Sequence, residues 1–308
     1  MSENLVAKLA TTQFTTNLEL KLQQMGSKLR GRVREGMHVG KMASPINQMS
    51  AIALAAPAGR FAPKDRTDAD FTRRWVFPID GEINQLIDSF DKLKTIVDPQ
   101  SEYVTNAANA VGRAWDDTII QAAFGTAQIG QDANGLSSET WASFSGAYTV
   151  ASTYGSGASA SGLSVAKLIE TKRILRKNQV DIETDPVTLV IGSQQESDLL
   201  NQVQVVSTEF NDRPVLVDGQ IKRFLGFDIV YSERLTTVSN VRQIIAFAKS
   251  GMYLGMWTDT YNNASIRNDL SGEPWQLYTQ TSYGATRTQP GKVVQILCAD
   301  ASGADITP

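Results

Sequence analysis

The side chains that most often carry out catalysis are scarce in this sequence. It holds one histidine, His38, and one cysteine, Cys298, in 308 residues. A catalytic nucleophile paired with an imidazole would have to use His38, which lies in a glycine-rich basic segment, and no Gly-x-Ser-x-Gly turn supplies a serine. Cys298 stands in an alternating apolar run, where a free cysteine packs as a small hydrophobic side chain. The sequence therefore predicts a protein that is not an enzyme and uses no cofactor.

Paired acidic residues are the remaining candidates for chemistry. Asp116-Asp117 and the pair Asp68 and Asp70 carry the carboxylate oxygens that Mg²⁺ and Ca²⁺ prefer. Neither pair has the glycine and the terminal glutamate of a calcium-binding loop. A zinc site would need several Cys or His ligands. We therefore interpret these residues as exposed structural acids and predict no metal site.

Positive charge gathers near the N-terminus. Lys28, Arg30, Arg32 and Arg34 alternate with glycines, a pattern that disfavours a compact independent fold. These cations could neutralise DNA phosphates, and contact with acidic groups of neighbouring chains is an equally good interpretation. The whole chain has a net charge of −3, from 29 Lys and Arg against 32 Asp and Glu, so it is not a general binder of nucleic acid. We predict an arm that needs a partner.

The composition is that of a folded soluble protein, with 42% hydrophobic and 20% charged residues. A single cysteine excludes an intramolecular disulfide, and neither end carries the charged and then apolar pattern of a secretory signal. The apolar stretch from Ala51 to Ala58 is alanine-rich and broken by Pro57, far short of the roughly 18 residues that a membrane-spanning helix needs. These features predict assembly in a reducing cytoplasm and exclude a membrane protein.

The elements that must position these residues follow from the spacing of apolar side chains. Helical spacing predicts a helix over 18–29, a long helix over 101–124 and another over 164–177. The proline-containing, charged segment 43–74 predicts a projecting hairpin, closed by a strand at 75–77. Downstream, the pattern predicts a helix that opens with a capping box from Ser193 to Glu196 and strands at 188–191, 228–232, 243–248, 252–257, 275–282 and 292–298. The fold class is mixed α+β with antiparallel character.

Short blocks of residues, which occur in order over most of the chain, together resemble the sequences of one known family. In the first half they are Thr72 to Pro78, Leu86 to Asp88, Asp98-Pro99, Tyr103, Asn106-Ala107, Gly112-Arg113, Asp116-Asp117 and Phe124-Gly125. In the second half they are Leu163 to Leu175, Leu216 to Gly219, Phe224 to Phe227, Ser232 to Arg234, Ala248 to Gly251, Gly284 to Arg287 and Val293 to Cys298. This set resembles the major capsid proteins of tailed bacteriophages. The resemblance implies the HK97-like capsid fold.

The resemblance also implies a division of the chain. The expected parts are an N-terminal arm over 1–35, an E-loop hairpin with its flanking segment over 36–80, a P-domain with a spine helix over 81–180, an A-domain over 181–284, and a C-terminal strand over 285–308 that returns to the P-domain. Extended arms and hairpins bury little surface within their own subunit, so neighbouring copies must offset the cost of ordering them. Assembly is thus expected to complete the fold.

The implied function is self-assembly into the icosahedral shell that encloses the phage double-stranded DNA. The implied partners are copies of the chain itself as hexamers and pentamers, a separate scaffold protein, a portal protein, and packaged DNA on the inner face. Residues expected to set the register between subunits are Lys64, Asp65, Arg66, Asp68, Asp70, Arg73, Arg74 and Trp75. The expected location is the virion, after assembly in the host bacterial cytoplasm. The alternative is a nucleic-acid-binding or scaffold-like structural protein that uses the basic arm, which predicts steeply salt-dependent DNA binding.

Overall fold

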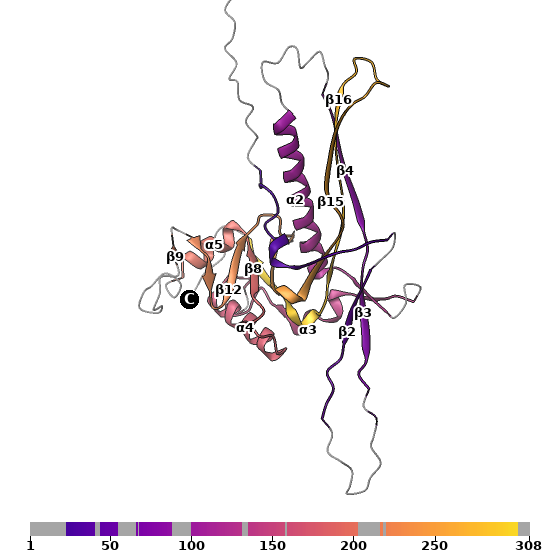
Figure 1. Ribbon diagram of the computed structural model, residues 1–308. Coiled ribbons are helices and arrows are strands. Elements are labelled where there is room, and N and C mark those ends of the chain that lie inside the picture. Colours follow the sequence, from indigo (N-terminus) through magenta and orange to yellow (C-terminus); the bar gives the residue numbers. More distant parts are fainter. Residues whose placement is uncertain are drawn as a thin grey trace, which may run out of the picture. The chain divides into compact units, whose positions relative to one another are not determined.

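A computed structural model describes residues 23–40, 44–54, 66, 68–87, 100–130, 135–157, 159–202, 216–217 and 220–300 (Figure 1). Lys64 and Asp65 of the predicted contact, and residues 18–22 of the predicted N-terminal helix, lie outside this described part. The chain forms two compact units. Unit 1 comprises Met1–Gly26, Asp80–Arg113 and Thr258–Thr281, and unit 2 comprises Ser27–Ile79, Ala114–Trp257 and Ser282–Pro308.

Unit 2 is built on a seven-stranded mixed sheet. Its order is β11 (Arg223–Phe224), β12 (Phe227–Tyr231), β8 (Val187–Ile191), β14 (Val241–Ala248), β17 (Val293–Ala299) and β7 (Thr149–Val150), with β13 (Thr237–Val238) paired to β14. The antiparallel character that the sequence predicts holds for β14 with β8 and β17, whereas β8 with β12 and β17 with β7 are parallel. All residues of β8 are buried, which explains its nearly continuous apolar sequence. The four strands predicted in this region are confirmed to within two residues.

Two helices, α4 (Val165–Lys177) and α5 (Ser193–Leu200), pack beside this sheet. α4 begins as predicted, because the Ser164 hydroxyl accepts a hydrogen bond from Lys167 N at 3.3 Å. α5 is also confirmed, but the prediction that Ser193 caps it is wrong. The N-cap is Gly192, whose N–H donates to the Gln195 side chain at 3.2 Å, and Ser193 is already the first helical residue.

A four-stranded sheet in unit 2 carries the predicted hairpin. Its order is β2 (Ser44–Met49), β3 (Phe71–Val76), β5 (Ala127–Ile129) and β6 (Ser137–Glu139). β2 and β3 are antiparallel, and Figure 1 shows them side by side below their labels. The strand predicted at 75–77 therefore starts earlier, at Phe71, and ends before Phe77, ahead of Pro78, which cannot donate a ladder hydrogen bond.

The predicted long helix is confirmed as α2 (Gln100–Phe124), which continues from unit 1 into unit 2. In unit 2 its buried residues include Trp115, Ile119 and Ala123, at helical spacing. The helix stops at Gly125, where an added methyl group would lie 2.7 Å from the backbone oxygen of Gln121. Among the described helices, none combines the length and the hydrophobicity needed to cross a membrane.

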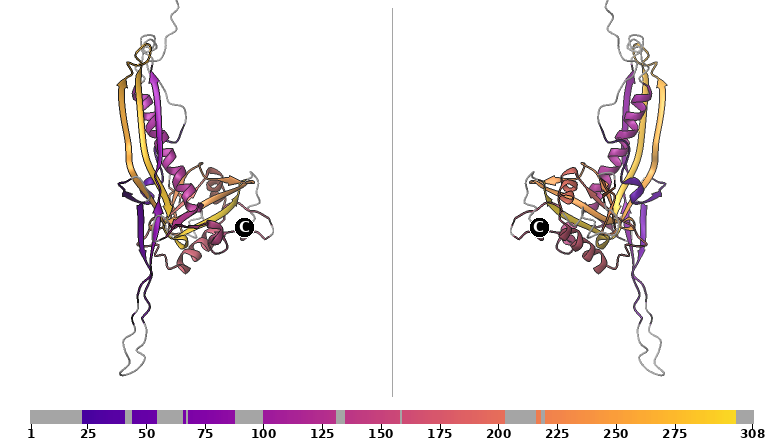
Figure 2. Two further views of the ribbon diagram at one scale, coloured as in Figure 1. Left: turned by 90° about the vertical axis from the view of Figure 1, so that its right-hand side faces the viewer. Right: turned by 90° about the vertical axis from the view of Figure 1, so that its left-hand side faces the viewer.

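Unit 1 contains most of three long neighbouring strands, β15 (Met252–Ile266), β16 (Trp275–Arg287) and β4 (Ile79–Ile87), which lie side by side in Figure 2. Polar pairs link them, and these are Gln276 Nε2 to Asn84 Oδ1 at 2.9 Å, Tyr278 Oη to Glu82 Oε2 at 3.1 Å and Thr279 Oγ1 to Asn262 Oδ1 at 2.8 Å. β15 and β16 extend beyond the predicted strands at 252–257 and 275–282. Their polar ends lack the apolar alternation by which a strand is recognised.

The remaining elements are short. They are β1 (Arg34–Met37), β9 (Leu216–Val217) paired with β10 (Gln220–Ile221), α3 (Ser145–Tyr148), and the 3₁₀ turns η2 (Arg30–Arg32), η3 (Trp141–Ser143), η4 (Lys249–Gly251) and η5 (Pro290–Lys292). The prediction of a helix over 18–29 is wrong for residues 23–29, which form no α-helix. Gly26 adopts φ +66, outside the helical region, and the backbone amides of Lys28 and Leu29 bind a side chain instead of a helical carbonyl.

Candidate functional site

Within the described ranges, no group of three or more His, Cys, Asp or Glu residues could hold a metal ion. Cys298 is fully buried, as predicted, and burial raises the pKa of its thiol to about 12. The His38 ring lies against Tyr253 and Trp257. Several polar groups of unit 2 hold segments together that are distant along the chain.

Lys167 on α4 is a fully buried cation that ties three segments of unit 2 together. Its ammonium donates hydrogen bonds to Ser161 O at 2.8 Å, to Gly162 O at 3.0 Å and to Leu297 O at 3.1 Å. Burial lowers the pKa of this group, and nearby groups offset the effect only in part. The ammonium thus replaces water by backbone oxygens and fixes α4 against β17.

One buried carboxylate holds the N-terminal segment of unit 2. Asp116 on α2 is fully buried, and it accepts hydrogen bonds from the Ser27 hydroxyl at 2.5 Å and from the N–H groups of Lys28 and Leu29 at 3.0 and 3.1 Å. Leu29 is itself fully buried, so a carboxylate and an apolar side chain fix the same turn. The prediction that Asp116 is an exposed acid is wrong, because the backbone of this segment folds over it.

Most of the cations predicted to meet DNA or neighbouring chains have partners in unit 2. These contacts are Lys28 Nζ to Tyr231 O at 2.8 Å, Arg30 Nε to Glu35 Oε2 at 3.3 Å and Arg32 Nη1 to Asp228 Oδ2 at 3.2 Å. The Arg30 guanidinium also lies over the Trp115 ring, 4.5 Å from its centroid. Arg34 is exposed on β1. The basic residues therefore attach this segment to its own subunit, which makes DNA contact a weaker interpretation than the sequence alone suggests.

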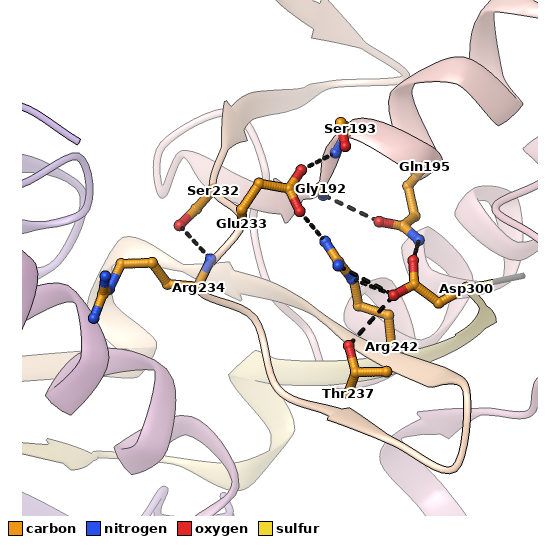
Figure 3. Close-up of polar contacts among 9 residues, drawn as sticks. All are labelled: Gly192, Ser193, Gln195, Ser232, Glu233, Arg234, Thr237, Arg242 and Asp300. Carbon is orange, nitrogen blue, oxygen red and sulfur yellow. Dashed lines mark hydrogen bonds and ion pairs between the residues drawn. The ribbon is translucent and has the colours of Figure 1, made fainter. Parts of the chain in front are cut away.

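A polar network at one side of the seven-stranded sheet joins four segments of unit 2 (Figure 3). Arg242 on β14 donates to Glu233 at 2.5 Å and pairs with Asp300 at 3.1 Å. Glu233 also accepts a hydrogen bond from the N–H of Ser193, so its carboxylate lies at the positive end of α5. Burial would raise the pKa of Glu233, but the hydrogen bonds from Arg242 and Ser193 outweigh it and lower the pKa to about 2. The network fixes Asp300, the residue that follows β17, against α5 and β14.

Two of the residues predicted to contact a neighbouring subunit point into unit 2. Arg74 is 8% exposed and pairs with Glu139 on β6. Trp75 is also buried, and its indole N–H donates to Gly130 O at 3.0 Å. These side chains fasten β3 to the strands beside it, so the fold of the subunit needs them in any case.

The other charged residues of the predicted contact are at the surface. Arg66 and Asp68 pair with each other at 2.8 Å, and both are exposed. Asp70 and Arg73 are exposed as well, and the Asp70 N–H donates to the Ser50 hydroxyl at 2.9 Å. Lys64 and Asp65 lie outside the described residues. The contact with a neighbour stays a prediction for these six positions.

An exposed apolar run at the end of β2 was not predicted from the sequence. Residues 49–54, Met-Ser-Ala-Ile-Ala-Leu, carry no charge. Met49 and Ile52 are 63% and 57% exposed, Leu54 is fully exposed, and Phe71 opposite Met49 is 64% exposed. Exposed apolar side chains gathered in one place mark a surface for contact with another molecule. The available signal was the uncharged, alanine-rich stretch from residue 51 to 58, which is too short for a membrane but well suited to an interface.

The chain matches one protein family over nearly its whole length, and its fold matches several solved structures. The model of the family described as "Phage capsid protein" matches residues 6–300. The fold is similar to that of the cyanophage Pam1 capsid, with TM-score 0.73, 12% identity, and coverage of 98% of this chain and all of that one. It is also similar to the capsid of cyanophage P-SCSP1u, with TM-score 0.72, 11% identity and coverage of 96% and 95%, and to the capsid of a native GTA particle, with TM-score 0.67, 10% identity and coverage of 96% and 99%. A search of curated proteins found no match. The shared fold is the HK97-like α+β fold.

Proposed function

The chain belongs to the phage capsid protein family and is a major capsid protein that forms the shell, and from this premise we propose how it does so. Copies of the chain associate as hexamers and pentamers, which close into an icosahedral shell around double-stranded DNA. A separate scaffold protein and a portal protein take part, and assembly proceeds in the cytoplasm of the host bacterium. The protein is a component of the virion and belongs to a structural family, not to an enzyme family.

The proposed division of labour keeps the five parts expected from the sequence. The arm over 1–35 and the E-loop over 36–80 reach neighbouring copies, the P-domain over 81–180 and the A-domain over 181–284 form the body, and the strand over 285–308 returns to it. The antiparallel pair of β2 and β3 supports the E-loop assignment, and the 25-residue helix α2 supports the spine helix. The position of β17 inside the seven-stranded sheet supports a C-terminal strand that returns to the body of the subunit.

One observation carries the proposal that the hairpin binds a neighbouring copy, namely the exposed apolar run over 49–54. Burying one side chain of the size of leucine or methionine stabilises a contact by about 1.5–3 kcal/mol. Exposed ion pairs contribute only about 0–1 kcal/mol each. Met49, Ile52 and Leu54 therefore supply the stabilisation of the interface, and the exposed charges of Arg66, Asp68, Asp70 and Arg73 set its register.

The proposal is tested by placing a charge on this run. Leu54 is fully exposed in its own subunit, so Leu54→Lys should leave folding unchanged and strongly reduce the yield of closed shells in electron micrographs. Leu54→Met, which keeps an apolar side chain at the same position, is the matched control and should assemble normally. Closed shells from Leu54→Lys at the wild-type yield would show that this run does not form the contact.

The contact of the arm with DNA is kept as a weaker proposal, for Lys28, Arg30, Arg32 and Arg34. Charge-removing substitutions of these four residues test that contact, by salt-dependent DNA binding. A deletion that tests the reach of the arm to neighbouring copies should end before Gln23, because residues 27–33 include the buried Leu29 and Val33 and the partners of Asp116. Removing residues 1–35 would therefore damage the fold of the subunit together with the arm.

A further inference from the structure

β2 is an edge strand, so one side of its backbone faces no other described strand. It lies at one end of its sheet and pairs with β3 only. A free strand edge presents a row of N–H and C=O groups, to which a further strand can pair. Proteins usually protect such an edge with charged side chains or proline, or by keeping the strand short.

Among the described edge strands, β2 is the least protected. Three other edge strands, β1, β4 and β6, carry charged residues, which are Arg34, Glu35, Asp80, Glu82 and Glu139. The remaining strands at sheet edges, β7, β9, β10, β11 and β13, have two residues each. β2 has six residues, and no charged residue occurs from position 42 to position 59. Its one protecting residue is Pro45.

Two hydrogen bonds determine which backbone groups of this edge are free. The Ser50 N–H donates to Asp70 O at 2.8 Å, so the backbone of Ser50 faces the strand that contains Phe71–Val76, β3. On the far side of β3, the Gly130 N–H donates to Arg73 O at 3.3 Å, so the backbone of Arg73 faces β5. Arg73 therefore turns its N–H and C=O away from its register partner on β2, Asn47.

Both hydrogen bonds lead to the same assignment, because backbone groups face the two sides of a strand alternately. The residues of β2 that face outward are Pro45, Asn47 and Met49. Proline has no N–H, and within a sheet it is tolerated where its nitrogen points away from the ladder, so Pro45 agrees with this assignment. The free edge offers the N–H groups of Asn47 and Met49 and the carbonyl oxygens of all three residues.

A second copy of the chain is the partner that fits this edge. The chain belongs to a family whose members form a shell, so its copies contact one another. The free backbone groups continue directly into the exposed apolar run over 49–54, in which Met49 is 63% exposed and Leu54 is fully exposed. A strand that pairs with β2 would therefore also cover the start of this run.

We infer that an extended segment of a neighbouring copy pairs with the free edge of β2 as an added strand, through backbone hydrogen bonds at Asn47 and Met49. Backbone pairing gives the contact a direction, because the hydrogen bonds form only at every second residue, whereas apolar contact is non-directional. This inference deepens the proposed contact of the hairpin and rests on that proposal.

Proline substitutions test the assignment of the free groups in the unassembled full chain. Asn47→Pro removes an outward N–H, as Pro45 does in the natural strand, so thermal unfolding should occur at nearly the wild-type temperature. Gln48→Pro removes an N–H that faces β3 and should clearly lower the unfolding temperature. An equal loss of stability in both variants would overturn the inference.

The lowest subunit concentration at which shells form, measured by light scattering and electron microscopy, tests the pairing itself. Asn47→Pro should raise this concentration by about tenfold relative to Asn47→Ala, the weight of one hydrogen bond between subunits. Asn47→Ala is the matched control, because it loses the same side chain but keeps the N–H. Met49→Pro and Met49→Leu repeat the comparison at the second outward N–H.

Hydrogen exchange of the wild type gives a second measurement of the same edge. The amides of Asn47 and Met49 should exchange about tenfold more slowly in shells than in the unassembled subunit. If Asn47→Pro assembles as readily as Asn47→Ala, or if the exchange of these amides does not change, the inference fails and the proposed shell remains. A wild-type chain that forms neither shells nor rings at any concentration would overturn both.

Discussion

Replacing Asp116 by alanine should detach residues 27–29 from α2 and destabilise the subunit. The substitution removes the acceptor of three hydrogen bonds, from Ser27, Lys28 and Leu29. The Leu29 N–H is buried and would lose its acceptor, at a cost of about 1–3 kcal/mol, while water can partly replace the acceptor for the other two donors, at about 0.5 kcal/mol each. We therefore expect a loss of about 3 kcal/mol in the free energy of unfolding.

The neighbouring residue on the same helix provides the control. Asp117 pairs with Arg234, and each side chain is about a third exposed, at 34% and 35%. Ion pairs at such positions contribute about 0–1 kcal/mol, so Asp117→Ala should destabilise the subunit by less than about 1 kcal/mol. Urea unfolding of the unassembled subunit, followed by circular dichroism, measures both values. The reasoning is refuted if Asp116→Ala unfolds at the same urea concentration as Asp117→Ala.

Three further predictions concern other charged or buried side chains. Arg74→Ala should lower the free energy of unfolding by about 3 kcal/mol, because it removes a buried guanidinium and leaves the Glu139 carboxylate, only 15% exposed, unpaired. Arg73→Glu on the exposed part of the same strand should leave thermal unfolding unchanged and reduce the number of particles in electron micrographs. The pKa of Glu233 is lowered from 4.5 to about 2 in the folded chain, so the stability that this group contributes is present above about pH 4.5 and is lost toward pH 2. Glu233→Gln should therefore make the free energy of unfolding depend less on pH in this window. An unaltered acid unfolding profile would argue against the network. Cys298, whose pKa burial raises to about 12, should react with a thiol reagent at pH 8 only after urea unfolding, and rapid labelling of the folded chain would contradict its burial.

The elements with strong local periodicity could be predicted from the sequence. Apolar side chains at helical spacing predict α2 and α4, and Ser164 marks the N-cap of α4. A run of apolar and β-branched residues predicts β8. The ends of β15 and β16 could not be placed, because residues 258–266 are mostly polar and residues 284–287 run from a glycine to the buried Arg287, so neither end shows apolar alternation. Strand length there depends on partners that lie far away in the sequence.

The contacts that hold the subunit together could not be predicted, because each joins residues that are distant along the chain. Asp116 binds a turn 87 to 89 residues before it, and no local pattern distinguishes it from its exposed neighbour Asp117. Arg74 pairs with Glu139, 65 residues later. The basic residues near the N-terminus have the composition of a DNA-binding arm, yet their partners in unit 2 become visible only when the chain is folded.

The central claim is that copies of this chain assemble into a closed shell. Electron microscopy of the purified chain, expressed alone and together with a scaffold protein, tests it most directly when light scattering of the same samples gives the mass. We expect closed shells, or rings of six and five subunits, in at least one of the two preparations. A homogeneous monomer or dimer in both would contradict the account.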